Sequence, residues 1–134
     1  MNVEQCKLGT NEWVTSDKCV VEVARYLKEK KLRRVYVVDS NGAPVGIISS
    51  TDISNHIVAD GKDAATLKAT DIMTRGILIV NIEDHTGSVA IEMDKFHVPS
   101  VAVVKSKKMI GVLTVEECAK ACLTLVTGGS KNAC

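Results

Sequence analysis

Residues 45–52 read VGIISSTD, and a second version of this stretch, IGVLTVEE, occupies residues 110–117. Each version reads as an apolar strand that contains a glycine and runs into a hydroxyl residue, with an acid three positions after that hydroxyl. The glycines, Gly46 and Gly111, are 65 residues apart, and the final acid changes from Asp52 to Glu117. A match of this kind predicts an internal duplication.

The similarity extends outward from the two glycines, which a single short match would not do. Up to a predicted hairpin turn, at residues 39–43 in the first half, matching residues are 66 positions apart. After it they are 65 apart, because the second turn, at residues 105–108, is one residue shorter. The aligned pairs are Asp17 with Glu83, Ala24 with Ala90, Leu27 with Met93, Leu32 with Val98, Val35 with Val101 and Val37 with Val103.

Each half predicts the same order of elements, strand, helix, strand, strand, helix, which is an α+β fold. The first hairpin turns at DSNG, residues 39–42, where an Asn-Gly pair suits positive φ. The expected strands are 13–15, 35–38 and 44–49 in the first half and 77–81, 101–104 and 109–114 in the second, with helices at 20–30, 51–58, 88–95 and 115–126.

The hairpin strands are almost continuously apolar, which predicts sheets covered on both faces. A unit of about 60 residues is marginal alone, so the two repeats are expected to pack sheet to sheet with pseudo-twofold symmetry. We place the first repeat at 1–60, a linker and the second repeat at 61–127, and a disordered tail at 128–134.

The composition excludes several functional classes. Seventeen Lys and Arg against 16 Asp and Glu give no basic surplus for nucleic acid, and only 3% of the 134 residues are aromatic, too few for base-stacking platforms. No run approaches the roughly 20 apolar residues of a membrane span. We therefore expect a cytoplasmic protein that binds neither nucleic acid nor membrane.

Catalytic and metal-binding patterns are not found in the sequence. The five cysteines form no CxxC pair, which argues against a zinc ribbon and a disulfide framework, and Cys118 and Cys122 are expected on one face of a helix. The histidines, His56, His85 and His97, fall on different elements without a nucleophile arrangement. We expect no catalytic residue, no metal site and no enzyme activity.

The first hairpin and its flanks resemble the most recognisable stretch of the cystathionine β-synthase (CBS) domain family, through VVDSNGAPVGIISSTDI at residues 37–53. DIMT at 71–74 is similar to the start of a second CBS repeat. The likeness covers nearly the whole chain and implies a tandem CBS pair, a Bateman module. RRVYVVD at 33–39 also resembles repeats in the γ subunits of AMP-activated and sucrose-nonfermenting kinases, which bind adenine nucleotides.

The resemblance implies a ligand cleft between the repeats. Asp52, at a helix N-terminus, would accept both ribose hydroxyls, and Arg34 would contact phosphate. Ser49 and Thr51 would add hydroxyls beside the free N–H groups of the first helical turn. Carried over by position, Asp52 would face Met73, Gly76 and Leu78, and Val98 and Pro99 would line the base pocket.

A structural alternative stands beside this site, because a hydroxyl followed three residues later by an acid is also a capping box. We favour the cap for Thr114 and Glu117, since glutamate is the usual acid of that motif, and the ligand site for Ser49 and Asp52, on the resemblance. The counterpart of Arg34 is Ser100. The opposite cleft, with Lys7 and Glu12, carries extra carboxylates that would repel phosphate, so one working site is expected.

The leading hypothesis is a non-catalytic sensor that needs no cofactor, binds AMP, ADP or ATP at Asp52 and signals to a regulated protein partner or fused effector domain. The family likeness also implies a homodimer. The alternatives are a structural dimerisation module with empty clefts, suggested by the unusual NEWVT at 11–15, and a binder of S-adenosylmethionine.

Overall fold

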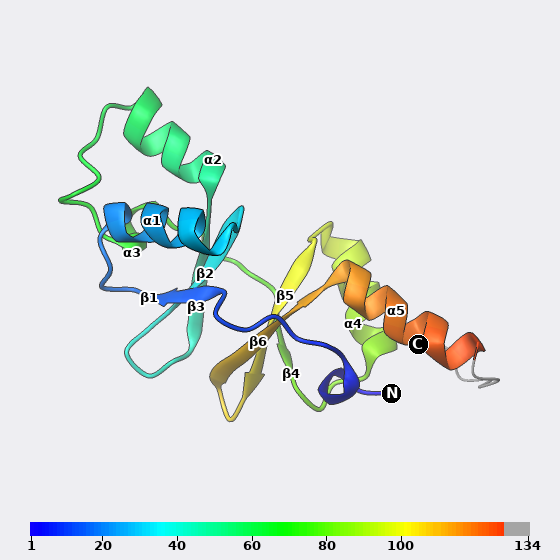
Figure 1. Ribbon diagram of the computed structural model, residues 1–134. Helices are drawn as coiled ribbons and strands as arrows, with labels where there is room; N and C mark the ends of the chain where they lie inside the picture. Colours follow the sequence, from blue (N-terminus) through cyan, green and yellow to red (C-terminus); the bar gives the residue numbers. More distant parts are fainter. Residues whose placement is uncertain (128–134) are drawn as a thin grey trace. The chain divides into compact units, whose positions relative to one another are not determined.

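The structure is a computed structural model that describes residues 1–127 and shows two separate three-stranded sheets (Figure 1). The chain divides into two compact units. One is Glu12–Ile77, here called the Asp52 unit, and the other combines Met1–Asn11 with the chain from Leu78 onward, here called the Glu117 unit. The predicted tail at 128–134 lies outside the described residues.

The Asp52 unit contains one mixed sheet in the order β1-β2-β3, in which β1 is parallel to β2 and β2 is antiparallel to β3. Its core combines the sheet with α1 and α3, including Val35, Val37, Ile48 and Ile72. Its elements are β1 (Trp13–Thr15), α1 (Val20–Lys30), β2 (Arg34–Val38), β3 (Pro44–Ser49), α2 (Ser50–Ile53), a π-helix at Ser54–Ala59 and α3 (Ala69–Ile72).

The Glu117 unit repeats this plan, with a mixed sheet in the order β4-β5-β6 and a core that includes Val101, Val103, Met93 and Leu113. The β-α-β-β-α order predicted for each half is therefore confirmed. Its elements are a 3-10 helix at Val3–Gln5, β4 (Ile79–Asn81), α4 (Thr86–Phe96), β5 (Ser100–Lys105), β6 (Lys108–Thr114) and α5 (Val115–Thr127).

Helix α1 shows why these segments form the predicted elements. Val20, Val23 and Leu27 are buried and recur with helical spacing, so one face packs on the sheet. At the start the Glu22 carboxylate accepts the Cys19 N–H at 3.2 Å. The helix ends at Lys31, whose φ of 57° is left-handed, and the Lys31 N–H bonds back to the Leu27 and Lys28 carbonyls.

The closing helix of the first repeat differs from the predicted helix at 51–58. It has four α-helical residues, Ser50–Ile53, and then a six-residue π-helix, Ser54–Ala59. The Asp60 N–H reaches the Asn55 carbonyl, five residues back, at 3.0 Å. Helix α5, in the second repeat, stays α-helical over Val115–Thr127.

The two hairpins turn by different means. In the first, Gly42 takes a φ of 84°, as the Asn-Gly pair predicted, and the Asp39 carboxylate accepts the N–H groups of Asn41 and Ala43 at 2.9 and 3.0 Å. In the second, Ser106 and Lys107 adopt φ values of 51° and 68° without a glycine. The shorter turn therefore places two non-glycine residues in the left-handed region.

A short segment docks on the outer strand of each sheet, and these segments explain the unit boundaries. In the Asp52 unit, Thr74 exchanges two backbone hydrogen bonds with Ile47 of β3, at 2.8 and 3.0 Å. In the Glu117 unit, Gly9 does the same with Val112 of β6, at 2.8 and 2.9 Å. The start of each repeat thus belongs to the compact unit of the other repeat.

Gly46 and Gly111 make this docking possible. A Cβ on Gly46 would lie 2.6 Å from Met73 Sδ, and one on Gly111 would lie 2.8 Å from Leu8 Cβ. Each glycine of the duplicated stretch therefore admits the segment that crosses its strand.

Candidate functional site

The Ser49 and Asp52 side chains form the complete capping box that the sequence offered as an alternative. Asp52 Oδ2 accepts the Ser49 N–H at 2.8 Å, and Ser49 Oγ accepts the Asp52 N–H at 3.1 Å. Both side chains are half-buried. The carboxylate is therefore fixed at the point where β3 passes into α2.

The cap leaves most of the accepting capacity of Asp52 open. A carboxylate offers about four lone-pair positions, and the cap uses one on Oδ2. Among residues 1–122, whose side chains the structure describes, the Asp52 carboxylate has no other hydrogen bond and no ion pair. Capping and binding of a diol are consequently compatible at the same side chain.

Arg34 lies beside this strand end, because it pairs with Ser49 across the β2–β3 ladder. Residues directly opposite in an antiparallel pair have side chains on the same face. The Arg34 and Thr51 side chains are exposed, and Arg34 has no ion pair with any residue in 1–127. A cationic residue thus pairs across the ladder with the first residue of the Ser49–Asp52 motif.

Six of the nine predicted site residues belong to the Asp52 unit: Arg34, Ser49, Thr51, Asp52, Met73 and Gly76. Met73 is half-buried against Gly46, and Gly76 is exposed with a φ of 78°. The other three, Leu78, Val98 and Pro99, belong to the Glu117 unit. Their role as the lining of a base pocket stays a prediction.

The second version of the motif holds its acid differently. Thr114 Oγ1 accepts the Glu117 N–H at 3.2 Å, as a cap should, but the Glu117 carboxylate accepts Lys120 Nζ at 3.3 Å. Lys7 lies in the same unit, whereas Glu12 lies in the Asp52 unit. Burial raises the pKa of the Glu12 carboxyl above its ordinary value.

The segments that precede β2 and β5 differ in charge by more than the change from Arg34 to Ser100. Residues 25–34, RYLKEKKLRR, contain six basic side chains and one acid, Glu29. The aligned residues 91–100, IEMDKFHVPS, contain one lysine and two acids. The first repeat therefore presents a strongly positive segment that the second lacks.

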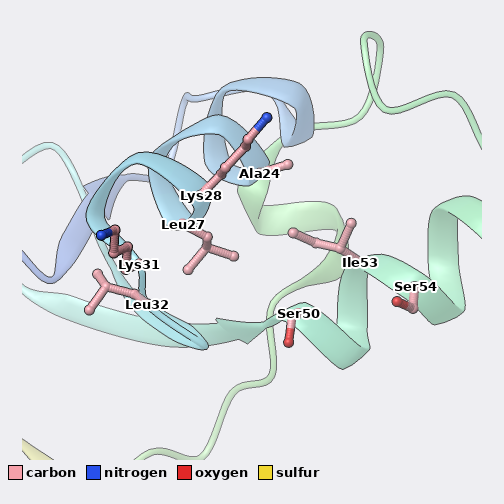
Figure 2. Close-up of a pocket in the computed structure, with 8 residues that line it drawn as sticks. All are labelled: Ala24, Leu27, Lys28, Lys31, Leu32, Ser50, Ile53 and Ser54. Carbon is pink, nitrogen blue, oxygen red and sulfur yellow. The ribbon is translucent and has the colours of Figure 1, made fainter.

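Sequence reasoning missed a cavity of about 470 Å³ between α1 and α2 (Figure 2). Ile53 points across this space toward α1, whereas Lys28 extends over α1 on the side away from it and Lys31 lies where α1 ends. The alignment held a signal for it, since Lys28 aligns with Asp94 and Lys31 with His97. The lining residues are Ala24, Leu27, Lys28, Lys31, Leu32, Ser50, Ile53 and Ser54.

Cys118, His85 and His97 take part in helix packing and helix ends. Cys118 is buried in α5, and its Sγ donates to the Thr86 carbonyl at 3.5 Å. His85 caps α4 by accepting the Gly87 N–H at 3.0 Å, and His97 ends that helix in the left-handed conformation. Within residues 1–127, no three His, Cys, Asp or Glu side chains are placed to hold a metal ion. Over the same residues, no helix is long and apolar enough to cross a bilayer.

Two β-α-β-β-α units, each with an acid three residues after the hydroxyl residue that ends its hairpin, define a protein built from a tandem pair of similar domains. The CBS domain family matches residues 14–59 and 69–124, and the chain belongs to that family as a tandem CBS pair, or Bateman module.

Solved CBS pairs share this fold. The CBS domain pair of protein MJ0100, in complex with 5-methylthioadenosine and S-adenosyl-L-methionine, is 27% identical with a TM-score of 0.70, covering 96% of this chain and 97% of that one. CBSX2 in complex with AMP is 23% identical with a TM-score of 0.73, covering 93% and 98%.

Among curated proteins, the L-aspartate semialdehyde sulfurtransferase of Methanocaldococcus jannaschii is 29% identical over 84% of this chain. The homoserine O-acetyltransferase of Methanocorpusculum labreanum is 26% identical over 87% of it. The chain spans only 20% and 23% of the lengths of these relatives.

Proposed function

We propose that this CBS pair is a non-catalytic regulatory module that binds an adenosine-containing ligand at Asp52. The observation that carries the proposal is the Asp52 carboxylate itself, fixed by the Ser49 N–H at 2.8 Å and without an ion pair in the described chain. A positioned, un-neutralised carboxylate can accept both hydroxyls of a ribose. The 27% identical pair in complex with two adenosine compounds supports this ligand class.

The two candidate ligands differ at the end remote from the adenine. AMP, ADP and ATP carry phosphate, for which Arg34 offers a planar fork of donors. S-adenosylmethionine carries a sulfonium centre and an amino acid instead, and the complex of the 27% identical pair favours it as the second candidate. Arg34 therefore separates ligands with an anionic end from methylthioadenosine, which lacks one.

The direct test is isothermal titration calorimetry with AMP, ADP, ATP, S-adenosylmethionine and methylthioadenosine. Asp52→Asn keeps a cap acceptor and removes the charge, so we expect it to weaken binding about tenfold or more. Glu117→Gln is the matched control in the second motif, and we expect it to leave the affinity unchanged. Equal affinity of the wild type and Asp52→Asn would show that the ligand binds elsewhere.

Arg34→Ala then identifies the ligand. For a phosphorylated ligand the variant should bind about tenfold more weakly, whereas for methylthioadenosine, which carries no anionic group, the affinity should stay the same. If none of the five compounds binds at millimolar concentration or raises the melting temperature, the cap is the whole role of the motif. The module would then be a structural dimerisation unit.

Signalling is the remaining part of the proposal. Ligand binding at Asp52 would be read out by a protein partner, a fused effector domain or a second copy of the module. A ligand shifts such an equilibrium only by its difference in affinity for the two states.

A further inference from the structure

The start of the chain is held on the Glu117 unit at two points. Near the beginning, the Val3 N–H donates to the Asp84 carbonyl at 2.9 Å, and the Val3 side chain is fully buried in the core of that unit. Farther along, Gly9 exchanges two backbone hydrogen bonds with Val112 of β6. Cys6 lies between these two points, so the backbone is anchored on both sides of it.

A second cysteine of the same unit lies in the core beneath this segment. Cys118 of α5 is 1% exposed, and its Sγ donates to the Thr86 carbonyl at 3.5 Å. Thr86 in turn donates to the Met1 carbonyl through its N–H and through its hydroxyl, at 3.0 Å each. Cys6 is half-buried and packs against the core cluster that contains Cys118. Two free thiols therefore share one part of this core.

The charges of the two thiols affect each other. Burial raises the pKa of the Cys6 thiol, and the negative charges of Cys118 and then of Glu117 raise it further. Burial also raises the pKa of the Cys118 thiol. Because the interaction between two charges weakens with distance and is screened by salt, the effect of Cys118 on Cys6 indicates that the two sulfurs are neighbours.

The first repeat has an apolar pair at the corresponding positions. The offset of 66 residues before the hairpin places Ile72 at the position of Cys6, and the offset of 65 after it places Ile53 at the position of Cys118. Two fully buried residues are related by the same offset of 66, Val3 and Ala69. Ile72 belongs to the core of the Asp52 unit, and Ile53 packs against that core. Apolar packing is thus sufficient for the fold, and only the second repeat has thiols at these positions.

We propose that Cys6 and Cys118 form a redox-responsive thiol pair, which becomes a disulfide and fixes the start of the chain to α5. The oxidant is a small-molecule disulfide such as oxidised glutathione. The thiolate of the half-buried Cys6 attacks one sulfur of the oxidant, forms a mixed disulfide and releases one glutathione thiolate. The Cys118 thiolate then attacks the Cys6 sulfur, forms the internal disulfide and releases the second glutathione thiolate. The two protein thiols lose two electrons and two protons, and one oxidised glutathione becomes two reduced molecules.

The disulfide would change how firmly the first segment is attached. In the reduced protein, hydrogen bonds and apolar contacts hold this segment, and such contacts open locally. In the oxidised protein a covalent bond restricts that opening. The proposal does not depend on ligand binding at Asp52.

The test is incubation of the folded, full chain with mixtures of oxidised and reduced glutathione, followed by acid quenching, tryptic digestion and mass spectrometry. Trypsin cleaves after Lys7, Lys108 and Lys120, so Cys6 and Cys118 fall in different peptides, and Cys122 falls in a third. We expect a linked pair of the peptides 1–7 and 109–120, which a reductant separates.

Matched variants separate this pair from other thiol chemistry. Cys6→Ser changes a half-buried side chain and should abolish the linked peptides. Cys19→Ser, which changes a half-buried free thiol of the Asp52 unit, should leave their yield unchanged.

Hydrogen exchange of the folded protein measures the attachment itself. Oxidation should slow exchange of the Val3 and Gly9 N–H groups about tenfold or more, because the closed loop resists local opening. The Thr74 N–H makes the corresponding bond in the Asp52 unit, at 2.8 Å, and should exchange at the same rate in both states.

Three results would overturn the proposal. The first is a glutathione adduct that persists on Cys6 while Cys118 stays reduced. The second is linkage of Cys6 to another cysteine, or linkage to Cys118 only after the protein has been unfolded in urea. The third is unchanged exchange of Val3 and Gly9 in the oxidised protein.

Discussion

Gly46→Ala is expected to destabilise the Asp52 unit through a single methyl group. An added Cβ would lie 2.6 Å from Met73 Sδ and 3.0 Å from the Thr74 carbonyl oxygen. Because ordinary contact begins near 3.4 Å, the sulfur must withdraw by about 0.8 Å and the oxygen by about 0.4 Å. The thioether can move cheaply, but the backbone oxygen cannot.

The Thr74 oxygen is fixed because it accepts the Ile47 N–H at 3.0 Å, while the Thr74 N–H donates to the Ile47 carbonyl at 2.8 Å. A displacement of about 0.4 Å stretches the first bond beyond the usual range. Overpacking of this kind costs about 1–3 kcal/mol of unfolding free energy. With a urea slope of about 1–3 kcal/mol per molar, the midpoint should fall by about 1 M.

Trp13 is the only tryptophan of the chain and lies in β1 of the same unit, so its fluorescence reports this transition in urea. The double variant Gly46→Ala/Met73→Ala should stay less stable than Met73→Ala, because the Thr74 oxygen still clashes. Gly111→Ala is the matched comparison in the other unit: its added Cβ would lie 2.8 Å from Leu8 Cβ and 3.4 Å from the Gly9 oxygen, so it too clashes, but without displacing a carbonyl that pairs with β3. A wild-type midpoint for Gly46→Ala would refute the reasoning.

Three further predictions follow from single contacts. Ser49→Ala removes the acceptor of the Asp52 N–H and should lower the free energy of unfolding, measured in urea, by about 1 kcal/mol. A change near zero would show that the cap does not form in solution. Burial raises the pKa of the Glu12 carboxyl, so its negative charge opposes folding at any pH above the pKa that it has in the unfolded chain. Glu12→Gln should therefore stabilise the protein at about pH 7 and lose this advantage near pH 4. A difference in unfolding free energy between variant and wild type that does not change with pH would contradict this. Burial also raises the pKa of the Cys6 and Cys118 thiols above their ordinary value of 9.0. Unfolding would let these thiols ionise, so the free energy of unfolding should fall as the pH rises past 9.0. Because few thiolates form at about pH 8, iodoacetamide should alkylate both cysteines slowly there.

The sequence predicted the elements well where a pattern is local and repeated. The helix at 20–30 and the strands at 13–15 and 44–49 have the predicted bounds, because helical spacing of Val20, Val23 and Leu27 and the flanking turn signals mark them directly. The strand expected at 77–81 begins instead at Ile79. Strand ends depend on pairing with another strand, here Ile79 with Ala102, which no local pattern encodes.

The π-helix, and the segments around Gly9 and Thr74 that dock on the sheets, could not be predicted for a related reason. Residues 54–59 contain no Gly or Pro that would mark an irregular helix, and packing decides whether their hydrogen bonds span four or five residues. The docking of Thr74 on β3 rests on backbone hydrogen bonds, which carry little side-chain signal. Gly46 was the one visible trace of it, since a strand glycine indicates a close backbone approach.

The hydrogen bonds of the candidate site were not predictable from its residue types. The sequence posed cap and ligand site as alternatives, whereas Asp52 completes the cap and retains free acceptor positions. The capping box expected for Thr114 and Glu117 forms only its Thr114 half, because the longer glutamate turns to Lys120. At α1 the equally long Glu22 does accept the N–H of its cap residue, Cys19, so the local partner decides where the acid bonds.

The different partners of the two acids argue for one ligand per chain. Asp52 bonds only to its own helix turn, so its charge stays beside β3 with no cation attached in the described chain. Glu117 pairs with Lys120 at 3.3 Å, and this cation lowers the net negative charge that the carboxylate offers to a diol. The neighbouring charges act in the same direction, because Arg34 stands opposite Ser49 while Ser100 stands opposite Thr114. Calorimetry should therefore give a stoichiometry near one nucleotide per chain, and two equivalent sites would contradict the asymmetry of the acids.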